Sequence, residues 1–358
     1  MVQWKHSALP RKPFYAIALR RSYMPVEAVL RRYLQLIKTE HFARYEKDFA
    51  NKIIEGLKAG YLQGLHEPDL VSIIDRVVNN LKGMSTSYDK FKISTKSIFI
   101  HGNKSQVEFE YYGKKVQREL GDLIFILSVI YNGRKYFEKL TISQFKKDSG
   151  ILSWNLSNRE QLYLLSRFPP FRGTSRSIIP RREFILPNYS GCLGSYNLLF
   201  RPGDFVYVSA SLLESFIGNR KCIDMSDVSR LWEQPCCDFT YPKLFAWPDV
   251  VGILGFSRCS PNVHDFVDKY LRGYIGELIY SDVGAYNRPA LDFLHELLSA
   301  IMKKAEKENN EEVESFVSEF FDYPYSDYPG GMKEDVNFDY EGGGIAIIYT
   351  LIDLGGGE

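Results

Sequence analysis

The residues best placed for chemistry in this chain are an aspartate and a glutamine–lysine pair on two neighbouring apolar segments. Asp122 stands at the start of the apolar run Leu123–Tyr131, and Gln144 and Lys146 stand near the end of the next run. Strand side chains alternate between two faces, so Gln144 and Lys146 share one face. A carboxylate, an amide oxygen and an ammonium at one sheet edge can bind a hard cation and offset negative charge.

The register of the intervening hairpin decides whether Asp122 joins the other two. A two-residue turn at Asn132-Gly133 would pair Tyr131 with Arg134 and turn Asp122 away from Gln144. A three-residue loop, with Gly133 left-handed in a bulge, places Asp122 on the same face as Gln144. We therefore predict the three-residue loop over 131–133.

Hydrophobic periodicity predicts the elements that must position these residues. Helical spacing indicates a helix from Pro25 to about Gly60. The region 171–260 is predicted to be largely irregular. The other predicted helices are Glu67–Leu81, Asn158–Ser166, Pro261–Tyr270 and Pro289–Lys307, the last continuing into the acidic segment after it. The predicted strands are Ser97–His101, Val107–Tyr112, Gln117–Tyr131, Tyr136–Phe145, Asn197–Phe200, Phe205–Ser209 and Ile345–Ile352.

This order of elements indicates an α/β fold with a mixed, antiparallel-leaning sheet. The central strands are apolar on both faces, so helices are expected to cover the sheet on both sides. We predict an N-terminal helical segment over 1–90, a core with its flanking helix over 91–185, and a C-terminal α+β region over 186–358. The last region carries no readable motif, and it either forms a separate unit or elaborates the same domain.

The net charge of +1 conceals an uneven distribution along the 358 residues. Residues 1–60 carry twelve Lys or Arg against five Asp or Glu, and residues 131–185 carry eleven against four. Residues 301–358 carry four against fourteen. The balance excludes a small basic protein that coats nucleic acid, but it allows a local basic surface. Solvated helix faces are the simpler interpretation of each charge run.

The cysteines and the apolar segments indicate the setting of the protein. The five cysteines show no Cys-x-x-Cys spacing, which favours reduced structural thiols over a zinc site. No segment reaches the roughly 18 apolar residues that a membrane span requires. The sequence therefore predicts a cytoplasmic protein with no membrane partner.

Two sequence blocks resemble known nucleases. The succession Glu119-Leu120-Gly121-Asp122, an apolar strand and Gln144-Phe145-Lys146 resembles the PD-(D/E)xK nuclease superfamily, whose restriction-endonuclease-like core carries an Asp and a (D/E/Q)-x-Lys on adjacent strands. This block, followed by REQLYLLSRFPPF at 159–171, is also similar to bacterial nuclease-like proteins found in defence contexts. Two departures are Gly121 in place of the superfamily's proline and Gln144 in place of a second carboxylate.

The resemblance implies a role for each residue of the motif. Asp122 would be the principal ligand of Mg²⁺ or Mn²⁺, with Gln144 and the backbone carbonyl of Phe145 as further ligands. Lys146 would orient the attacking water or stabilise charge on the scissile phosphate. A further acid is expected: Glu119 would fill this role if a bulge at Gly121 turned it inward. Glu110 and Glu55 are its rivals.

A basic and aromatic stretch after the Gln-x-Lys strand is the predicted nucleic-acid surface, because arginine forks hold phosphates and aromatic rings stack on bases. The predicted contacts are Lys147, Arg159, Arg167, Arg172 and Arg176, with Arg181 and Arg182 nearby. The alternative is a loop whose arginines only cover the core.

These observations support two main hypotheses. The first is an Mg²⁺-dependent endonuclease that cleaves DNA, most simply double-stranded DNA, in bacterial anti-phage defence, acting as a homodimer or with other defence subunits. The second is a nuclease-like protein that has lost cleavage and serves as a nucleic-acid-binding or scaffold subunit of a defence complex. A weaker third is an α/β protein unrelated to nucleic acid, in which Asp122 caps a strand and Gln144, Lys146 and Lys147 form a solvated strand end.

Overall fold

The computed structural model describes residues 28–101, 105–149, 152–232, 238–239, 255–282, 287–325 and 344–355. Within these residues, a mixed sheet of nine strands runs through the molecule in the order β1-β2-β16-β5-β6-β9-β10-β14, with β15 paired to β6. The strands are β1 (Met84–Ser85), β2 (Lys92–His101), β5 (Leu123–Tyr131), β6 (Arg134–Lys147), β9 (Gly194–Phe200), β10 (Asp204–Ser209), β14 (Cys259–Ser260), β15 (Glu277–Ser281) and β16 (Gly344–Asp353).

The strand directions confirm the predicted mixed, antiparallel-leaning sheet of an α/β fold. β16 runs parallel to β5, and β6 runs parallel to β9. The other neighbouring pairs of this sheet are antiparallel. Strands from the predicted core, 91–185, and from the region 186–358 pair within this one sheet.

The central strand β5 divides the hydrophobic core into two clusters, one on each face of the sheet. Ile124 and Ile126 pack into one cluster, whereas Phe125 and Leu127 pack into the other. This division follows from the period of two in a strand that is buried on both faces. Asp122 has the parity of Ile124 and therefore lies on the face of the first cluster.

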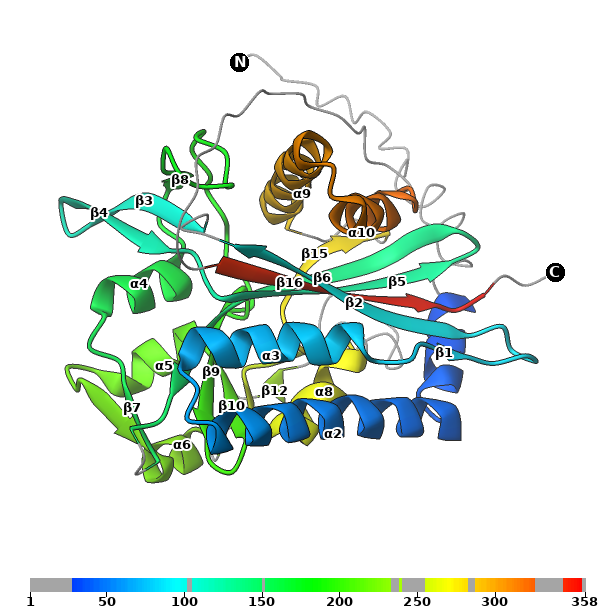
Figure 1. The fold of residues 1–358 in the computed structure, drawn as a ribbon, viewed down its shortest axis with the longest axis horizontal. Coiled ribbons are helices and arrows are strands. Elements are labelled where there is room, and N and C mark those ends of the chain that lie inside the picture. The colour runs from blue at the N-terminus through cyan, green and yellow to red at the C-terminus, as the bar shows by residue number, and fades with distance from the viewer. Residues whose placement is uncertain are drawn as a thin grey trace, which may run out of the picture.

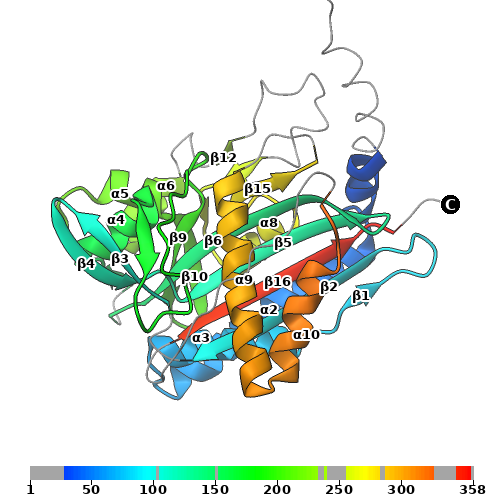
Figure 2. The same cartoon turned by 90° about the horizontal axis from the view of Figure 1, so that it is seen from above.

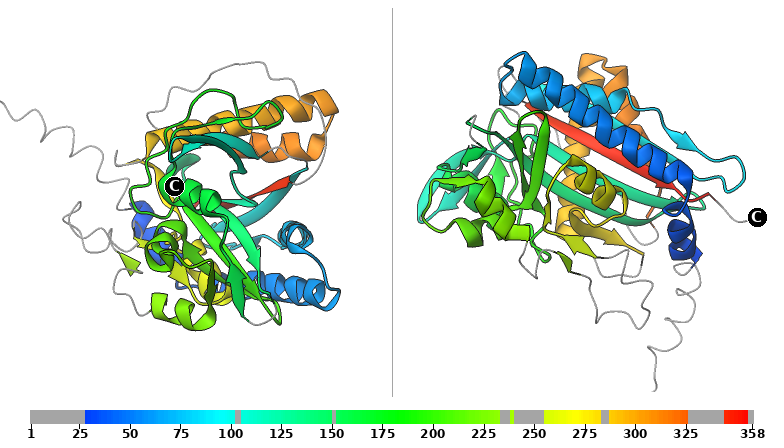
Figure 3. Two further views of the ribbon diagram at one scale, coloured as in Figure 1. Left: turned by 90° about the vertical axis from the view of Figure 1, so that its left-hand side faces the viewer. Right: turned by 90° about the horizontal axis from the view of Figure 1, so that it is seen from below.

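Helices cover both faces of the sheet, as expected from its two apolar faces. Figure 1 shows α9 and α10 on one side of the sheet and α2, α3 and α8 on the other. Seen from above, α9 and α10 lie across the strands (Figure 2), and the view from below shows α2 and α8 over the opposite face (Figure 3). These helices are α2 (Glu40–Leu62), α3 (Glu67–Asn79), α8 (Val263–Leu271), α9 (Arg288–Glu308) and α10 (Glu311–Phe321).

A smaller sheet of three strands, in the order β4-β3-β8, lies beside one end of the main sheet (Figure 1). Its strands are β3 (Gln106–Tyr111), β4 (Lys114–Glu119) and β8 (Phe171–Gly173). The prediction of one strand over Gln117–Tyr131 was therefore wrong. The chain leaves the small sheet after Glu119 and enters the main sheet at Leu123, so residues 120–122 link two different sheets.

Further elements complete the described fold. α4 (Arg159–Arg167) confirms the predicted helix after the Gln-x-Lys strand, and Asn158 caps it by accepting from Gln161 N. The region 171–260, predicted as irregular, contains two helices that sequence periodicity missed. These helices are α5 (Ala210–Ile217) and α6 (Met225–Trp232), and the remaining short strands are β7 (Ser153–Asn155), β11 (Cys222–Asp224), β12 (Asp238–Phe239) and β13 (Phe256–Ser257).

Two long predicted helices are each divided by a capping residue. The predicted helix from Pro25 to about Gly60 is a short helix over 28–36 followed by α2, and the hydroxyl of Thr39 accepts from Phe42 N at 3.1 Å. Residues 25–27 lie outside the described part. The helix α9 ends at Asn309, whose φ of 52° closes it, and the acidic segment forms the separate helix α10.

Among the described residues, no helix has the length and apolar character needed to cross a membrane. In the described part of the chain, Cys192 and Cys259 are buried and Cys222 is exposed, and none of the three forms a disulfide. Cys236 and Cys237 lie outside the described residues.

Candidate functional site

The β5–β6 hairpin brings Asp122 and Gln144 together by a different route from the predicted one. The turn has two residues, Asn132 and Gly133, with φ of 52° and 71°, and Tyr131 lies opposite Arg134. The prediction of a three-residue loop was therefore wrong. The two-residue turn forms because an Asn-Gly turn with both residues left-handed matches the twist of the strands.

A β-bulge in β6 corrects the register. Ile130 pairs with Lys135, but Val129 pairs with Phe137, so the ladder shifts by one residue at Tyr136. From there to the end of the hairpin the register differs from the predicted one by two residues, so the same side chains share a face as predicted, and Leu123 lies opposite Ser143. Asp122, one residue before this last pair, consequently has its side chain beside that of Gln144.

The backbone of Asp122 is held on both sides. Its N–H donates to the carbonyl of Ser143 at 2.9 Å, and its carbonyl accepts from Ala346 N at 2.9 Å. A Cβ on the preceding residue, Gly121, would lie 2.9 Å from Cγ2 of Ile142 and 3.1 Å from the Ser143 oxygen. Glycine therefore precedes Asp122 because the chain passes too close to β6 for a side chain.

The carboxyl group of Asp122 is bound to the Gln-x-Lys strand. Its Oδ2 accepts from Phe145 N at 2.7 Å and from Nε2 of Gln144. Desolvation, opposed by the Phe145 hydrogen bond and by Lys146, raises the pKa of the Asp122 carboxyl from 3.8 to about 7. Asp122 therefore holds a proton more readily than an exposed aspartate.

Gln144 leaves an acceptor unused. Its side chain is 5% exposed, and its Oε1 is buried with no hydrogen-bond partner. A buried amide oxygen without a partner costs free energy of the order of 1–3 kcal/mol. Such an atom beside a carboxylate is an available ligand for a cation or a water molecule.

Lys146 is bound to an acid that the sequence analysis missed. Its Nζ lies 2.6 Å from Oε1 of Glu67, and the two side chains are 26% and 27% exposed. The other oxygen of Glu67 accepts from Lys147 N at 3.2 Å. Glu67 is the first residue of α3, where a negative charge is stabilised by the helix N-terminus. The only sequence signal was its place before Pro68 at the predicted helix start.

Glu119 also belongs to the electrostatic environment of the site. Burial raises the pKa of its carboxyl, while Lys146 lowers it and Glu67 raises it. Its backbone carbonyl accepts from Nε2 of Gln161 on α4 at 2.8 Å. The rival acids are placed elsewhere: Glu110 is exposed on β3 and Glu55 is exposed on α2.

The residues present suit a hard cation, although no preformed metal cage is found. Among the described residues, no group of three or more His, Cys, Asp or Glu side chains is arranged to hold a metal ion. The second oxygen of Asp122 and the unpartnered Oε1 of Gln144 are nevertheless oxygen ligands of the type that Mg²⁺ prefers. Two carboxyl groups with raised pKa values are also what a bound cation would stabilise in ionised form.

The predicted nucleic-acid residues differ in how far protein contacts already occupy them. Lys147 donates to the carbonyl of Leu65 at 2.5 Å, and Arg159 donates to the carbonyl of Arg220. Arg167 pairs with Glu214 at 2.8 Å, and Arg172 pairs with Glu108 at 2.6 Å. Arg176 is exposed on the loop after β8, at the edge of a surface pocket.

Comparisons with known proteins identify no relative. No family model matches the chain, and neither the curated proteins nor the solved structures include a match.

Proposed function

We propose that this protein is a metal-dependent endonuclease that hydrolyses phosphodiester bonds with Asp122, Gln144 and Lys146. The observation that carries the proposal is the register of the hairpin, which brings the carboxyl of Asp122 to the amide of Gln144, with Lys146 two residues further along the same face. Asp122, Gln144 and the carbonyl of Phe145 would hold Mg²⁺ or Mn²⁺. Glu119 would add a second negative charge near the ion.

The arrangement assigns each protein group a task. A bound Mg²⁺ would supply a water of lowered pKa and offset charge on the phosphate. The Lys146 ammonium, partly exposed and held by Glu67, would stabilise the negative charge that builds up on the phosphate during attack. The raised pKa of Asp122 makes its ionisation, and so its ability to bind a cation, dependent on pH near neutrality.

The fold around the site is compatible with the restriction-endonuclease-like core that the sequence resembles. Such cores carry the Asp and the Gln-x-Lys on adjacent strands; here Asp122 directly precedes β5, and Gln144 and Lys146 lie on its neighbour β6. After β6 the chain passes through α4 and returns in β9, which is parallel to β6. DNA as the substrate, a homodimer or defence-system partners, and a role in anti-phage defence rest on the resemblance alone and stay predictions.

One observation favours the second hypothesis, a nuclease-like subunit that binds nucleic acid without cleaving it. The charged groups of the site already have protein partners: Lys146 pairs with Glu67, and Oδ2 of Asp122 accepts two hydrogen bonds. A site held in this way resembles one that has been retained for structure. The two proposals differ over the unpartnered oxygen of Gln144. In the endonuclease this oxygen would bind the metal ion, and in the subunit that does not cleave it would not.

Nicking of supercoiled plasmid in Mg²⁺ or Mn²⁺ tests the catalytic proposal. We expect Asp122→Ala and Lys146→Ala each to lower the nicking rate by about 100-fold or more, as loss of a group that stabilises charge in a transition state does. Glu55→Ala and Lys47→Ala, both on exposed positions of α2, are matched controls that should nick like wild type.

The assay separates the two proposals. Equal nicking by wild type, Asp122→Ala and Lys146→Ala would sink the catalytic assignment. No nicking by wild type in either metal, together with retained binding of the plasmid, would favour the subunit that binds without cleaving.

A further inference from the structure

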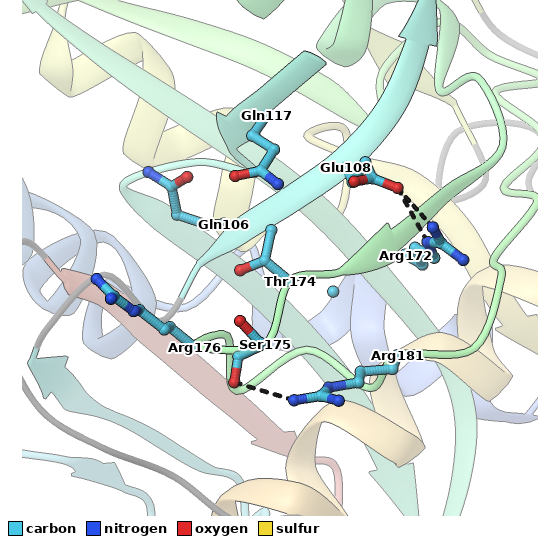
Figure 4. Close-up of a pocket in the computed structure, with 9 residues that line it drawn as sticks. Gln106, Glu108, Gln117, Arg172, Thr174, Ser175, Arg176 and Arg181 are labelled. Atoms are coloured by element: carbon cyan, nitrogen blue, oxygen red, sulfur yellow. Dashed lines mark hydrogen bonds and ion pairs between the residues drawn. The ribbon is translucent and has the colours of Figure 1, made fainter. Parts of the chain in front are cut away.

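A polar pocket lies beside the candidate site, on the small sheet. It has a volume of about 670 Å³ and is bounded by the β3–β4 ribbon, β8 and the loop after β8. Figure 4 shows Gln106 and Gln117 along the ribbon, with Arg176 and Arg181 on the loop opposite them. The volume falls within the range of about 300–1,000 Å³ that small-molecule sites occupy.

Strand register links this pocket to the candidate site. Gln106 pairs with Glu119 and Glu108 pairs with Gln117, so these four side chains share one face of the ribbon. Glu119 is three residues from Asp122, a span of at most about 11 Å. With about 5.5 Å across a strand pair, Cα of Gln106 lies within roughly 16 Å of Cα of Asp122. One bound nucleic acid is long enough to contact both places.

The charge of the pocket is concentrated on two arginines. Arg172 is bound through Nε and Nη2 to Oε1 of Glu108, at 3.1 and 2.6 Å, so these two charges offset one another. Arg181 makes one long contact, 3.4 Å from Nη2 to the carbonyl of Ser175. For Arg176, no hydrogen bond or ion pair is found with the described part of the chain. The pocket therefore offers two exposed guanidinium groups to an anion.

Exposed arginines elsewhere on the described surface are of two kinds: Arg44, Arg134 and Arg201 also lack an ion pair, whereas four others have one. Arg118, Arg167, Arg182 and Arg220 each form an ion pair with an acid, respectively Glu160, Glu214, Glu296 and Asp227. Arg176 and Arg181 have no such acid, although Glu108 lies in the same pocket. Their place in the pocket, together with the absence of a paired acid, leaves both guanidinium groups available to an anionic ligand.

The loop that carries these arginines is built to a fixed shape. Gly173 N donates to the carbonyl of Pro180 at 3.0 Å, and Thr174 N donates to the carbonyl of Gln106 at 3.1 Å. A Cβ on Gly173 would lie 1.8 Å from the carbonyl oxygen of Ile179, so this position requires glycine. The guanidinium groups are therefore presented from a closed loop that is tied to the ribbon.

We propose that the pocket binds one nucleotide of a nucleic-acid strand, with its phosphate against Arg176 and Arg181 and its base edge against Gln106 and Gln117. Guanidinium groups suit a phosphate, and an amide that both donates and accepts suits a base edge. Because Gln117, Arg176 and Arg181 are exposed, the ligand is held from one side, as a unit within a strand is. The inference rests on the proposed function and names a place where its substrate is held away from the reacting phosphate.

Binding without cleavage tests this proposal. Fluorescence anisotropy in EDTA, with a labelled single strand and the matching duplex, measures affinity as a function of salt. We expect Arg176→Gln/Arg181→Gln to bind at least tenfold more weakly, with the slope of log affinity against log salt reduced by nearly two units for the duplex. Arg134→Gln/Arg288→Gln, the same charge change at the β5–β6 turn and on α9, should bind like wild type.

The two glutamines are tested by base preference. Gln106→Ala/Gln117→Ala should reduce the discrimination among homopolymer strands and keep the wild-type salt slope. Wild-type affinity and slope for the double arginine variant, or competition by free deoxynucleoside monophosphate as effective as by the strand, would overturn the proposal.

The outcomes also separate this inference from the proposed function. Asp122→Ala should bind like wild type in EDTA while failing to nick. If nicking depends on Asp122 but binding is unaffected by the double arginine variant, the pocket fails and the function stands. If the arginines are needed for binding but nicking is absent in wild type, the pocket stands and the catalytic proposal fails.

Discussion

Strand β6 carries a lysine near each of its ends, each paired with an acid, and the two clusters differ in how completely their atoms are paired. Near its start, Lys135 lies 3.0 Å from Glu138, and both side chains are fully buried. Near its end, Lys146 pairs with Glu67 and each side chain is about one quarter exposed. The first cluster joins the sheet to α9 and to the segment after α10, whereas the second joins it to the start of α3.

The buried cluster is closed, in the sense that its charged groups are bound by partners inside the protein. Nζ of Lys135 donates to Oε1 of Glu138 and, at 3.0 Å, to the hydroxyl of Tyr325, and it lies 3.4 Å from the ring centroid of Phe320. The hydroxyl of Tyr325 donates to Oε2 of Glu138 at 2.7 Å and lies 2.9 Å from Nε2 of His295. Burial lowers the pKa of His295 to about 4, so it stays neutral at pH 7.

The cluster at the end of β6 is open by comparison. Oε1 of Gln144 is buried with no partner, and Asp122 beside it has a raised pKa. Both clusters contain buried polar groups, so burial of charge does not by itself distinguish a functional site from a structural one. The difference is an acceptor left unpaired beside a carboxylate that is costly to ionise.

The largest expected effect comes from breaking the closed cluster. Glu138→Ala leaves the Lys135 ammonium buried without its acid and should lower the free energy of unfolding by about 3–5 kcal/mol. Denaturant unfolding followed by tryptophan fluorescence measures the loss. The double variant Lys135→Met/Glu138→Leu removes both charges and should recover most of it. A loss below about 1 kcal/mol for Glu138→Ala would mean that the cluster is not closed.

An intermediate effect is expected from Asp122, and it depends on pH. The folded carboxyl has a pKa of about 7 against an ordinary value of 3.8. Between these values the unfolded chain ionises first, so unfolding releases a proton and wild-type stability falls as pH rises from about 4 to about 7. The pKa difference corresponds to a loss of about 4 kcal/mol in the free energy of unfolding. Because water reaches the half-buried carboxyl, we expect a loss of about 2 kcal/mol.

Asp122→Asn is the variant that isolates the contribution of the Asp122 carboxyl to the pH dependence of stability. It should be more stable than wild type by about 2 kcal/mol at pH 8, and the difference should vanish near pH 4. Thermal unfolding at a series of pH values measures it. Mg²⁺ should narrow the gap at pH 8 by stabilising wild type but not Asp122→Asn, and a gap independent of pH would contradict the raised pKa.

The smallest effect is expected at the partly exposed ion pair of Lys146 and Glu67. Glu67→Gln should lower the free energy of unfolding by only about 0.5–1 kcal/mol, because water and salt screen a pair that is one quarter exposed. A double-mutant cycle with Lys146→Gln, in low and high salt, measures the coupling. A coupling as large as that of Glu138 with Lys135 would remove the distinction between the clusters.

Several features of the fold and site were predictable because they depend on neighbouring residues. The shared face of Gln144 and Lys146 follows from strand parity, and the start of α4 follows from the capping asparagine, Asn158. The apolar run of β5 predicted a central strand covered on both faces, which the two core clusters confirm.

Other features depend on contacts between distant segments. The bulge at Tyr136 offsets a two-residue turn, and the sequence offers no local sign of that bulge. Glu67 reaches Lys146 only because α3 packs with its first turn at the end of β6. Likewise, the chain changes sheets at residues 120–122, since β4 pairs with β3 while β5 is enclosed by β6 and β16.

By itself, therefore, the sequence determined which residue types stand on each strand, which of them share a face, and where most helices begin. Covalent geometry sets those properties over a few residues. Only the tertiary structure decided which strand ends meet, which acid holds Lys146, and which arginines remain free of acids beside the ribbon. These depend on sheet register and on packing between segments up to hundreds of residues apart, for which no local pattern carries a signal.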